Sequence, residues 1–373
     1  MNHPIENGLL QMLKISKAAL RAQELTGKTV VYHRREVLDE TVHFLKGNPE
    51  GSPVLFGVKN TGQINFDLVE TLKTASGFLF HTVDKLAERG RALDTELVNP
   101  LTGRVMTGSS SASCINILKG INDLAIGTDG GGSVLAPAIS TGLYSVMAKG
   151  LGLQGSRPRV STDNINFLPG IGVISHSYHL CKIAISSLTG VELINLKELK
   201  IKPKKLAVPK RGSTFLPDGR DIRDLLDTAL NAICNLVVVT EKDFNGIGYR
   251  KQAISFCNEL FDDGIEMILT IEGPVDLYGI GDSVLGCWGM VGSQIQKLSG
   301  KSLLKVANMV DATALSLPTG ELATGFLLLG RPGSQTGSFM LALGDLINGL
   351  NPVPPLFTKY FTEWYQDEDK GFI

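Results

Sequence analysis

Two segments rich in glycine and serine decide how this sequence is interpreted: residues 106–113 read MTGSSSAS, and residues 127–138 read GTDGGGSVLAPA. Between them, residues 114–119 predict a short helix, and residues 124–126 predict an apolar strand that leads into the second segment. Glycine has no Cβ, so consecutive glycines let the chain turn sharply and leave the backbone N–H groups unobstructed. Several such groups at the start of a helix favour an anion.

Ser133 is the first residue after these glycines and is expected beside their N–H groups. The oxyanion that develops during acyl transfer is an anion of the kind that such groups stabilise. The second segment alone is therefore compatible with two interpretations. Ser133 is either a nucleophile in an acyl-transfer site or a capping serine in a plain glycine turn.

The two segments together resemble the core of the amidase signature family, which runs as GGSSGGS, a helix, a strand and GSDTGGSIRxPA. The separation of Ser109 and Ser133 agrees with the family's usual spacing. Upstream, GSPVLFGVKN (residues 51–60) is similar to the family's GxPxxVKD strand, and NPLTGR (99–104) is similar to its NPxxPxR segment. ALSLPTG (314–320) and ATGFLLLGRPG (323–333) are similar to the family's closing strands. The chain differs from the family at Leu135, where the family has arginine, and at Asn60, where it has aspartate.

The resemblance implies a Ser–cis-Ser–Lys triad. Ser133 is then the nucleophile, Ser109 the proton relay and Lys59 the base, with a cis peptide bond between Gly108 and Ser109. Lys59 follows the apolar run 54–58, and burial there would lower its pKa and make it a base near neutral pH. The remaining site residues implied by the resemblance are the oxyanion-hole and substrate-binding group Gly108, Ser110, Asp129, Gly130, Gly131 and Gly132, in which Asp129 organises the glycine loop through backbone N–H bonds.

Apolar runs that alternate with helical patterns predict an α/β fold. Strands are expected near residues 29–32, 53–58, 124–126, 206–208, 235–239, 266–270 and 325–329, and helices near 5–25, 34–45 and, in two pieces, 66–89. We expect one large domain over residues 1–373, with an N-terminal helical segment (1–50) packed on the core. The sheet of the amidase signature fold is expected to be twisted, mixed and mostly parallel, with helices on both faces.

Composition and motifs argue against several classes of protein and of binding site. Lys plus Arg number 36 and Asp plus Glu 37, so no basic surplus suggests nucleic acid. The N-terminal residues 1–20 predict neither a signal peptide nor a membrane span. The number of cysteines is five, which is odd, and the sequence contains no CxxC. This argues against a disulfide framework and against a cysteine zinc site. The GxGxxG match at residues 150–155 lacks the strand and helix of a dinucleotide site. We expect a cytoplasmic protein that binds a small-molecule amide and does not bind a membrane. We expect it to need no metal and no cofactor, and a homodimer is possible.

The function expected from the sequence is hydrolysis of a non-peptide carboxylic amide through an acyl-enzyme on Ser133, with release of ammonia or an amine. Two alternatives remain open. One is a catalytically silent amidase-like subunit for binding or assembly, and the other is the glutaminase subunit of an amidotransferase. The sequence does not identify the amide.

Overall fold

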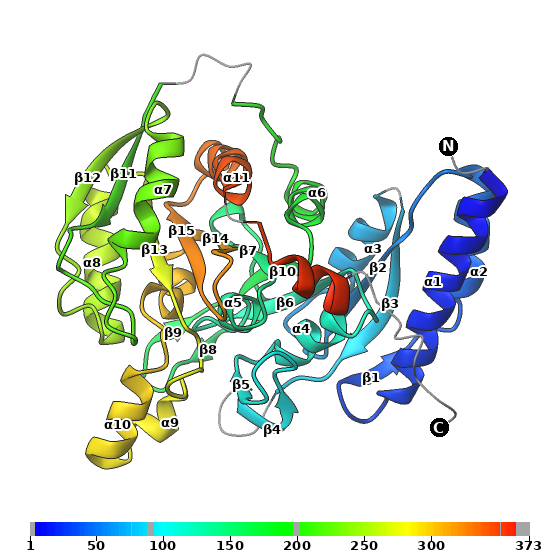
Figure 1. Ribbon diagram of the computed structural model, residues 1–373, viewed down its shortest axis with the longest axis horizontal. Coiled ribbons are helices and arrows are strands. Elements are labelled where there is room, and N and C mark those ends of the chain that lie inside the picture. Colours follow the sequence, from blue (N-terminus) through cyan, green and yellow to red (C-terminus); the bar gives the residue numbers. More distant parts are fainter. Residues whose placement is uncertain (1–3, 76, 88–92, 197–201, 351, 363–373) are drawn as a thin grey trace.

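The computed structural model describes residues 4–362 apart from residues 76, 88–92, 197–201 and 351 (Figure 1). The strands are β1 (Val30–His33), β2 (Val54–Lys59), β3 (Phe78–Asp84), β4 (Leu93–Val98), β5 (Val105–Thr107), β6 (Leu124–Asp129), β7 (Tyr144–Ala148), β8 (Arg159–Val160), β9 (Asn166–Phe167), β10 (Gly170–Ser175), β11 (Lys204–Pro209), β12 (Val237–Lys242), β13 (Met267–Glu272), β14 (Thr313–Pro318) and β15 (Gly325–Gly330).

The helices are α1 (Pro4–Glu24), α2 (Val37–Gly47), α3 (Phe66–Thr74), α4 (Ser111–Leu118), α5 (Leu135–Ser140), α6 (Tyr178–Thr189), α7 (Arg223–Ile233), α8 (Arg250–Asp262), α9 (Ser283–Gly286), α10 (Gly289–Lys297), α11 (Ser334–Asn348) and α12 (Pro355–Phe357). Short helical turns are η1 (Lys149–Leu151), η2 (Leu303–Lys305), η3 (Ala307–Val310) and η4 (Thr358–Thr362). In the described parts of the chain, no helix combines the length and apolar character needed to cross a membrane.

An 11-stranded mixed sheet in the order β1-β3-β2-β6-β10-β7-β14-β15-β13-β11-β12 organises the fold (Figure 1). The predicted α/β class and mixed sheet are confirmed, but the expectation of mostly parallel pairing is wrong. From β6 to β13 every neighbouring pair is antiparallel. Parallel pairs lie on either side, where β2 joins β3 and β6, and β11 joins β12 and β13. The reason is that β10 inserts between β6 and β7 and runs against both, while β14 and β15 form a hairpin.

Apolar side chains on the sheet alternate between two cores, as the two-residue period of a strand requires. In β15, Phe326 and Leu328 pack in one core and Leu327 and Leu329 in the other. The first core includes apolar residues of α3, α6, α7 and α11, and the opposite face is covered by α4, α5 and α8. Helices therefore cover both faces, as predicted.

Helices α1 and α2 lie beside the β1–β3–β2 end of the sheet (Figure 1). Ile15 and Ala18 of α1 and Val37 of α2 form a small cluster with Leu55 of β2, so this N-terminal segment packs on the sheet face opposite the first core. The assignment of residues 1–373 to one domain stays a prediction.

The expected second helix within residues 66–89 is wrong, because Phe78–Asp84 forms strand β3. Aromatic and β-branched residues dominate that stretch and suit a strand. Residues 88 and 89 lie outside the described residues.

Candidate active site

The site forms where β2 and β6 end side by side. These strands are parallel neighbours, with Val58 paired to Ile126, so their carboxyl ends meet at the same edge of the sheet. Lys59 is the last residue of β2, and Thr128 and Asp129 are the last two of β6. The loop before α4 brings Ser109 to this edge, and the glycine loop between β6 and α5 brings Ser133. The topology thus gathers the three residues that the sequence suggested as a triad.

Lys59 has the burial expected of a neutral lysine. Its side chain is only 2% exposed. The Nζ atom lies 2.5 Å from Ser109 Oγ, 2.8 Å from Thr128 Oγ1 and 3.1 Å from the Thr128 carbonyl oxygen. Burial lowers the pKa of Lys59 from 10.5 to about 7; the Asp129 carboxylate acts in the opposite direction, and Arg159 lowers it further. Near neutral pH a substantial fraction of this amine is therefore neutral and able to accept a proton.

Ser109 lies between Lys59 and Ser133. Its side chain contacts Lys59, and its backbone N–H donates to Ser133 Oγ at 3.2 Å. In the described part of the chain no hydrogen bond joins the two serine hydroxyls directly, so the link to Ser133 is through the main chain. A direct contact between the two hydroxyls therefore requires a change of side-chain rotamer.

The expected cis bond between Gly108 and Ser109 is absent: the only cis peptide bond in the described residues is Gly273–Pro274. Gly108 turns the chain instead through its φ of +120°, a conformation that favours glycine. A Cβ at residue 108 would also lie 2.7 Å from Pro137 Cδ, so only glycine fits this approach.

Asp129 lies beneath the glycine loop and holds it through backbone hydrogen bonds. One carboxylate oxygen accepts the N–H of Gly132 at 2.7 Å, and the other accepts the N–H of Val134 at 2.7 Å. This arrangement is the one expected for Asp129. It also means that Gly132 N–H is already bonded, contrary to its expected place in an oxyanion hole. Within the described residues, the backbone N–H groups of Gly130, Gly131 and Ser133 donate no hydrogen bond.

These groups line a cavity of about 530 Å³, called here the serine cavity. Its wall includes Lys59, Gly108, Ser109, Gly130, Gly131, Gly132 and Ser133. Ser110 was expected at the substrate but is buried outside this wall, because its Oγ points toward Gly127.

The sequence analysis missed Thr128, which accepts two hydrogen bonds from Lys59 and stands directly before Asp129. It also missed four cations of the wall, which come from distant segments without a local motif: Arg159, Arg250, Lys301 and Lys305.

Gly132→Ala is expected to destabilise the protein by about 1–3 kcal/mol. Gly132 has a φ of +96°, and a Cβ there would overlap the Leu304 side chain and lie 3.3 Å from the Leu304 carbonyl oxygen. Urea unfolding measures the change in the free energy of unfolding.

Gly131→Ala is the matched control, because a Cβ at residue 131 meets Arg250 Nη2 and the Lys305 carbonyl oxygen at ordinary distances of 3.5 and 3.7 Å and its φ is not in the left-handed region. If both variants unfolded at the same urea concentration, the tight fit of Gly132 against Leu304 would be wrong.

No protein-family model matches the chain, and no curated protein matches its sequence. Solved structures match it over nearly its whole length. An amidase family protein from Bacillus anthracis aligns with a TM-score of 0.60 at 13% identity, covering 92% of this chain and 89% of that one. 6-Aminohexanoate cyclic dimer hydrolase aligns with a TM-score of 0.60 at 12% identity, covering 95% and 96%. A bacterial aryl acylamidase of the amidase signature family aligns with a TM-score of 0.57 at 15% identity, covering 94% and 99%. The chain therefore has the amidase signature fold.

Proposed function

We propose that this protein hydrolyses a carboxylic amide through an acyl-enzyme on Ser133. The observation that supports the proposal best is the buried Lys59, whose Nζ lies 2.5 Å from Ser109 Oγ in the cavity that Ser133 also lines. A buried amine whose pKa is about 7, next to a serine pair, provides a base at neutral pH without a histidine. Among the described residues, no histidine lines this cavity.

In the first step, neutral Lys59 takes the hydroxyl proton of Ser109, and Ser109 takes that of Ser133. Ser133 Oγ then forms a bond to the amide carbonyl carbon, and the carbonyl oxygen becomes an oxyanion. This step needs the side-chain rotation that brings the two serine hydroxyls into contact. The relay then returns the proton to the amide nitrogen, the C–N bond breaks, and ammonia or an amine leaves.

The unbonded N–H groups of Gly130, Gly131 and Ser133 are the proposed donors to the oxyanion. Each well-placed donor contributes about 3 kcal/mol to the stability of such a transition state. Because Asp129 holds the loop from below, the donors are already ordered before substrate binds. Water then attacks the acyl carbon while Lys59 accepts the water proton through Ser109. The ester bond to Ser133 Oγ breaks, the relay returns the proton to Ser133 Oγ, and the carboxylic acid is released.

The test is labelling of the wild-type protein with a fluorophosphonate, followed by peptide mapping. Ser133 Oγ should form a bond to phosphorus with loss of fluoride, and the labelled peptide should contain residue 133. Labelling elsewhere would contradict the assignment of the nucleophile. An unlabelled protein that also hydrolyses no amide in a broad panel would favour the silent binding or assembly subunit.

A further inference from the structure

The serine cavity adjoins a second cavity of about 680 Å³. Five residues line both cavities and form their common boundary: Arg250, Ser283, Gln296, Lys301 and Lys305. Three of the five are cations. A substrate group placed at this boundary would therefore be close to both the nucleophile and a concentration of positive charge.

The boundary reaches the glycine loop itself. Arg250 Nη2 lies 3.5 Å from the point where a Cβ on Gly131 would be, and the Lys305 carbonyl oxygen lies 3.7 Å from the same point. Leu304, the residue before Lys305, packs against Gly132. The guanidinium group of Arg250 is thus next to the loop that carries Ser133.

The positive charges of the boundary are only partly neutralised by nearby carboxylates. Arg250 Nη1 pairs with Asp163 at 2.5 Å, which leaves Nη2 facing the loop. Lys301 pairs with Asp276 at 3.3 Å. Lys305 Nζ donates to the Gly248 carbonyl oxygen at 3.2 Å, and no carboxylate in the described chain forms an ion pair with it.

Burial lowers the pKa of Lys305 to about 8, and the charges of Arg250 and Lys301 lower it further, although Glu272 and Asp163 act in the opposite direction. A bound anion would relieve this repulsion.

Carboxylates near the boundary are already occupied. Glu272 accepts the N–H groups of Ser302 and Leu303 at 2.5 and 2.7 Å, one on each carboxyl oxygen, and burial raises its pKa to about 7. Asp282 accepts two N–H groups at the start of α9. Arg159, at the serine cavity, forms no ion pair with any described residue and adds to the excess positive charge.

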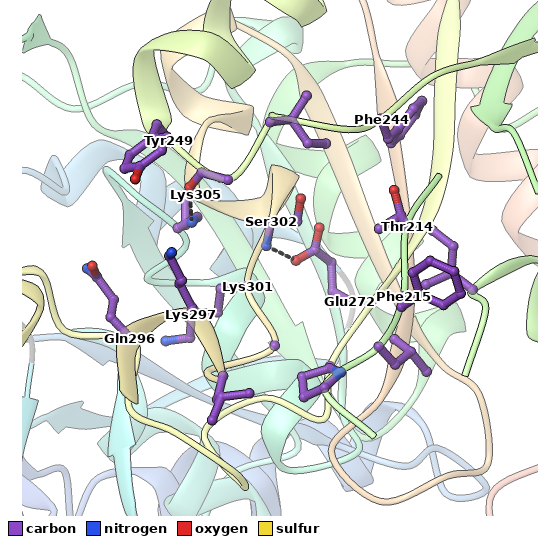
Figure 2. A pocket seen from close by; sticks show the side chains of 18 of the residues that line it. Thr214, Phe215, Phe244, Tyr249, Glu272, Gln296, Lys297, Lys301, Ser302 and Lys305 are labelled. Atoms are coloured by element: carbon purple, nitrogen blue, oxygen red, sulfur yellow. Dashed lines mark hydrogen bonds between the residues drawn. The ribbon is translucent and has the colours of Figure 1, made fainter. Parts of the chain in front are cut away.

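The second cavity has lysines on one side and two phenylalanines on the other. Figure 2 shows Lys297, Lys301 and Lys305 on one side and Phe215 and Phe244 on the other. This arrangement suits an elongated molecule that has an anionic group at the boundary and an apolar part beyond it.

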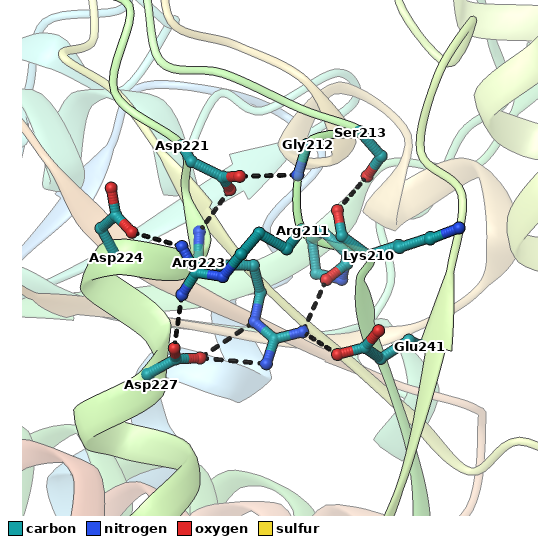
Figure 3. Close-up of polar contacts among 10 residues, drawn as sticks. Lys210, Arg211, Gly212, Ser213, Asp221, Arg223, Asp224, Asp227 and Glu241 are labelled. Atoms are coloured by element: carbon teal, nitrogen blue, oxygen red, sulfur yellow. Dashed lines mark hydrogen bonds and ion pairs between the residues drawn. The ribbon is translucent and has the colours of Figure 1, made fainter.

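The segment that carries Phe215 is anchored beside the cavity by a network of charged groups (Figure 3). Arg211 pairs with Asp224 and Asp227 at 2.5 and 2.6 Å, and Gly212 N–H donates to Asp221 at 2.6 Å.

We infer that the substrate is an amide that carries a carboxylate, an inference that rests on the proposed amide hydrolysis. The carboxylate binds between Arg250 Nη2 and the Lys305 ammonium, while the amide carbonyl lies at Ser133 and the rest of the molecule extends into the second cavity. A single negative charge fits a boundary whose third cation, Lys301, already pairs with Asp276. Hydrolysis then converts this amide and water into a second carboxylate and ammonia or an amine.

The experiment compares matched amides as competitors of fluorophosphonate labelling at Ser133. Malonamate, succinamate and glutaramate carry one carboxylate, and malonamide, succinamide and glutaramide are their neutral counterparts. At least one carboxylate should give half protection at a concentration about tenfold or more below that of its diamide, as expected for a charge-assisted hydrogen bond. Equal protection by every carboxylate and its diamide would overturn the inference.

Variants show whether the two cations cause the difference. Arg250→Gln and Lys305→Met should each raise the half-protecting concentration of the preferred carboxylate about tenfold relative to that of its diamide, measured on the same variant. Lys251→Met is the matched control, because Lys251 is the next residue of α8, is exposed and lines neither cavity. Carboxylate protection that persists in both cavity variants would contradict the site.

A failure of the proposed function has a different signature. If Ser133 is not labelled, calorimetric titration of the same six compounds still measures the carboxylate site without any catalysis. Preferential binding of a carboxylate that is lost in Arg250→Gln and Lys305→Met would then retain the anion site and reject only the hydrolysis. Absence of that preference would reject both.

Discussion

Replacement of Ser133 by alanine is expected to lower kcat/KM for amide hydrolysis by on the order of 10⁴-fold or more. The reason is that the acyl-enzyme cannot form without the Oγ atom, while the glycine loop and its N–H groups remain. Within the described residues, Ser133 Oγ accepts one hydrogen bond, from the N–H of Ser109. Its loss should therefore change the free energy of unfolding by only about 1 kcal/mol.

Steady-state hydrolysis and urea unfolding of Ser133→Ala measure the two effects separately. Ser255→Ala serves as the control, because Ser255 is an exposed residue of α8 outside the serine cavity. A Ser133→Ala protein that keeps its fold and hydrolyses amides at the wild-type rate would exclude the acyl-enzyme on Ser133.

Lys59→Met is expected to remove activity to a similar extent, because the variant has no group to take the proton of Ser109. In the wild type, kcat/KM should rise with pH through about 7, as Lys59 loses its proton, and then level off. A histidine base, supplied by His176 or His179, is the alternative to Lys59 and is tested in the same series. His176 Nε2 lies 3.5 Å from Asp123 Oδ1, and His176 does not line the serine cavity, so His176→Gln should retain the wild-type profile. A profile that is lost with His176 or His179 and retained in Lys59→Met would exclude the lysine base.

The same titration makes stability depend on pH. The pKa of Lys59 is about 7 in the folded protein and 10.5 ordinarily, so between these values the unfolded chain binds a proton that the folded chain has released. The free energy of unfolding of the wild type therefore rises with pH across this window. Below about pH 7 both states are protonated, and the cost of the buried charge is complete, on the order of 5 kcal/mol for a shift of this size.

Lys59→Met lacks this titration, so it should be at least as stable as the wild type near pH 7, and its advantage should shrink as pH rises toward 10. Urea unfolding of both proteins at pH 7, 8, 9 and 10 measures the difference. A constant difference across the series would mean that Lys59 has its ordinary pKa in the folded protein.

Local patterns were sufficient to predict the parts of the site that lie close together in the sequence. The apolar run before Lys59 predicted a buried strand, and β2 has those bounds within a residue or two. The glycines before Ser133 predicted a sharp turn next to a strand end, and β6 ends at Asp129 as that turn requires. These features depend on the residues themselves and on their immediate neighbours.

Features that depend on tertiary contacts were missed. Antiparallel pairing at the sheet centre depends on where β10 inserts, and residues 170–175 carry no local mark of that position. The expected cis bond came from the family resemblance, whereas Gly108 provides the turn by its positive φ. Arg250 and Lys305 belong to separate helical segments, α8 and η2, that tertiary packing brings to the glycine loop.

The division of the site between chain segments bears on how such a protein can diverge. The reacting groups all lie within residues 59–133, whereas the charged boundary between the two cavities is built from residues 250–305. In the proposed function, chemistry and selectivity are therefore encoded in separate stretches of the gene. Mutation or recombination in the later stretch can change which molecules are consumed while the bond-breaking machinery is inherited intact.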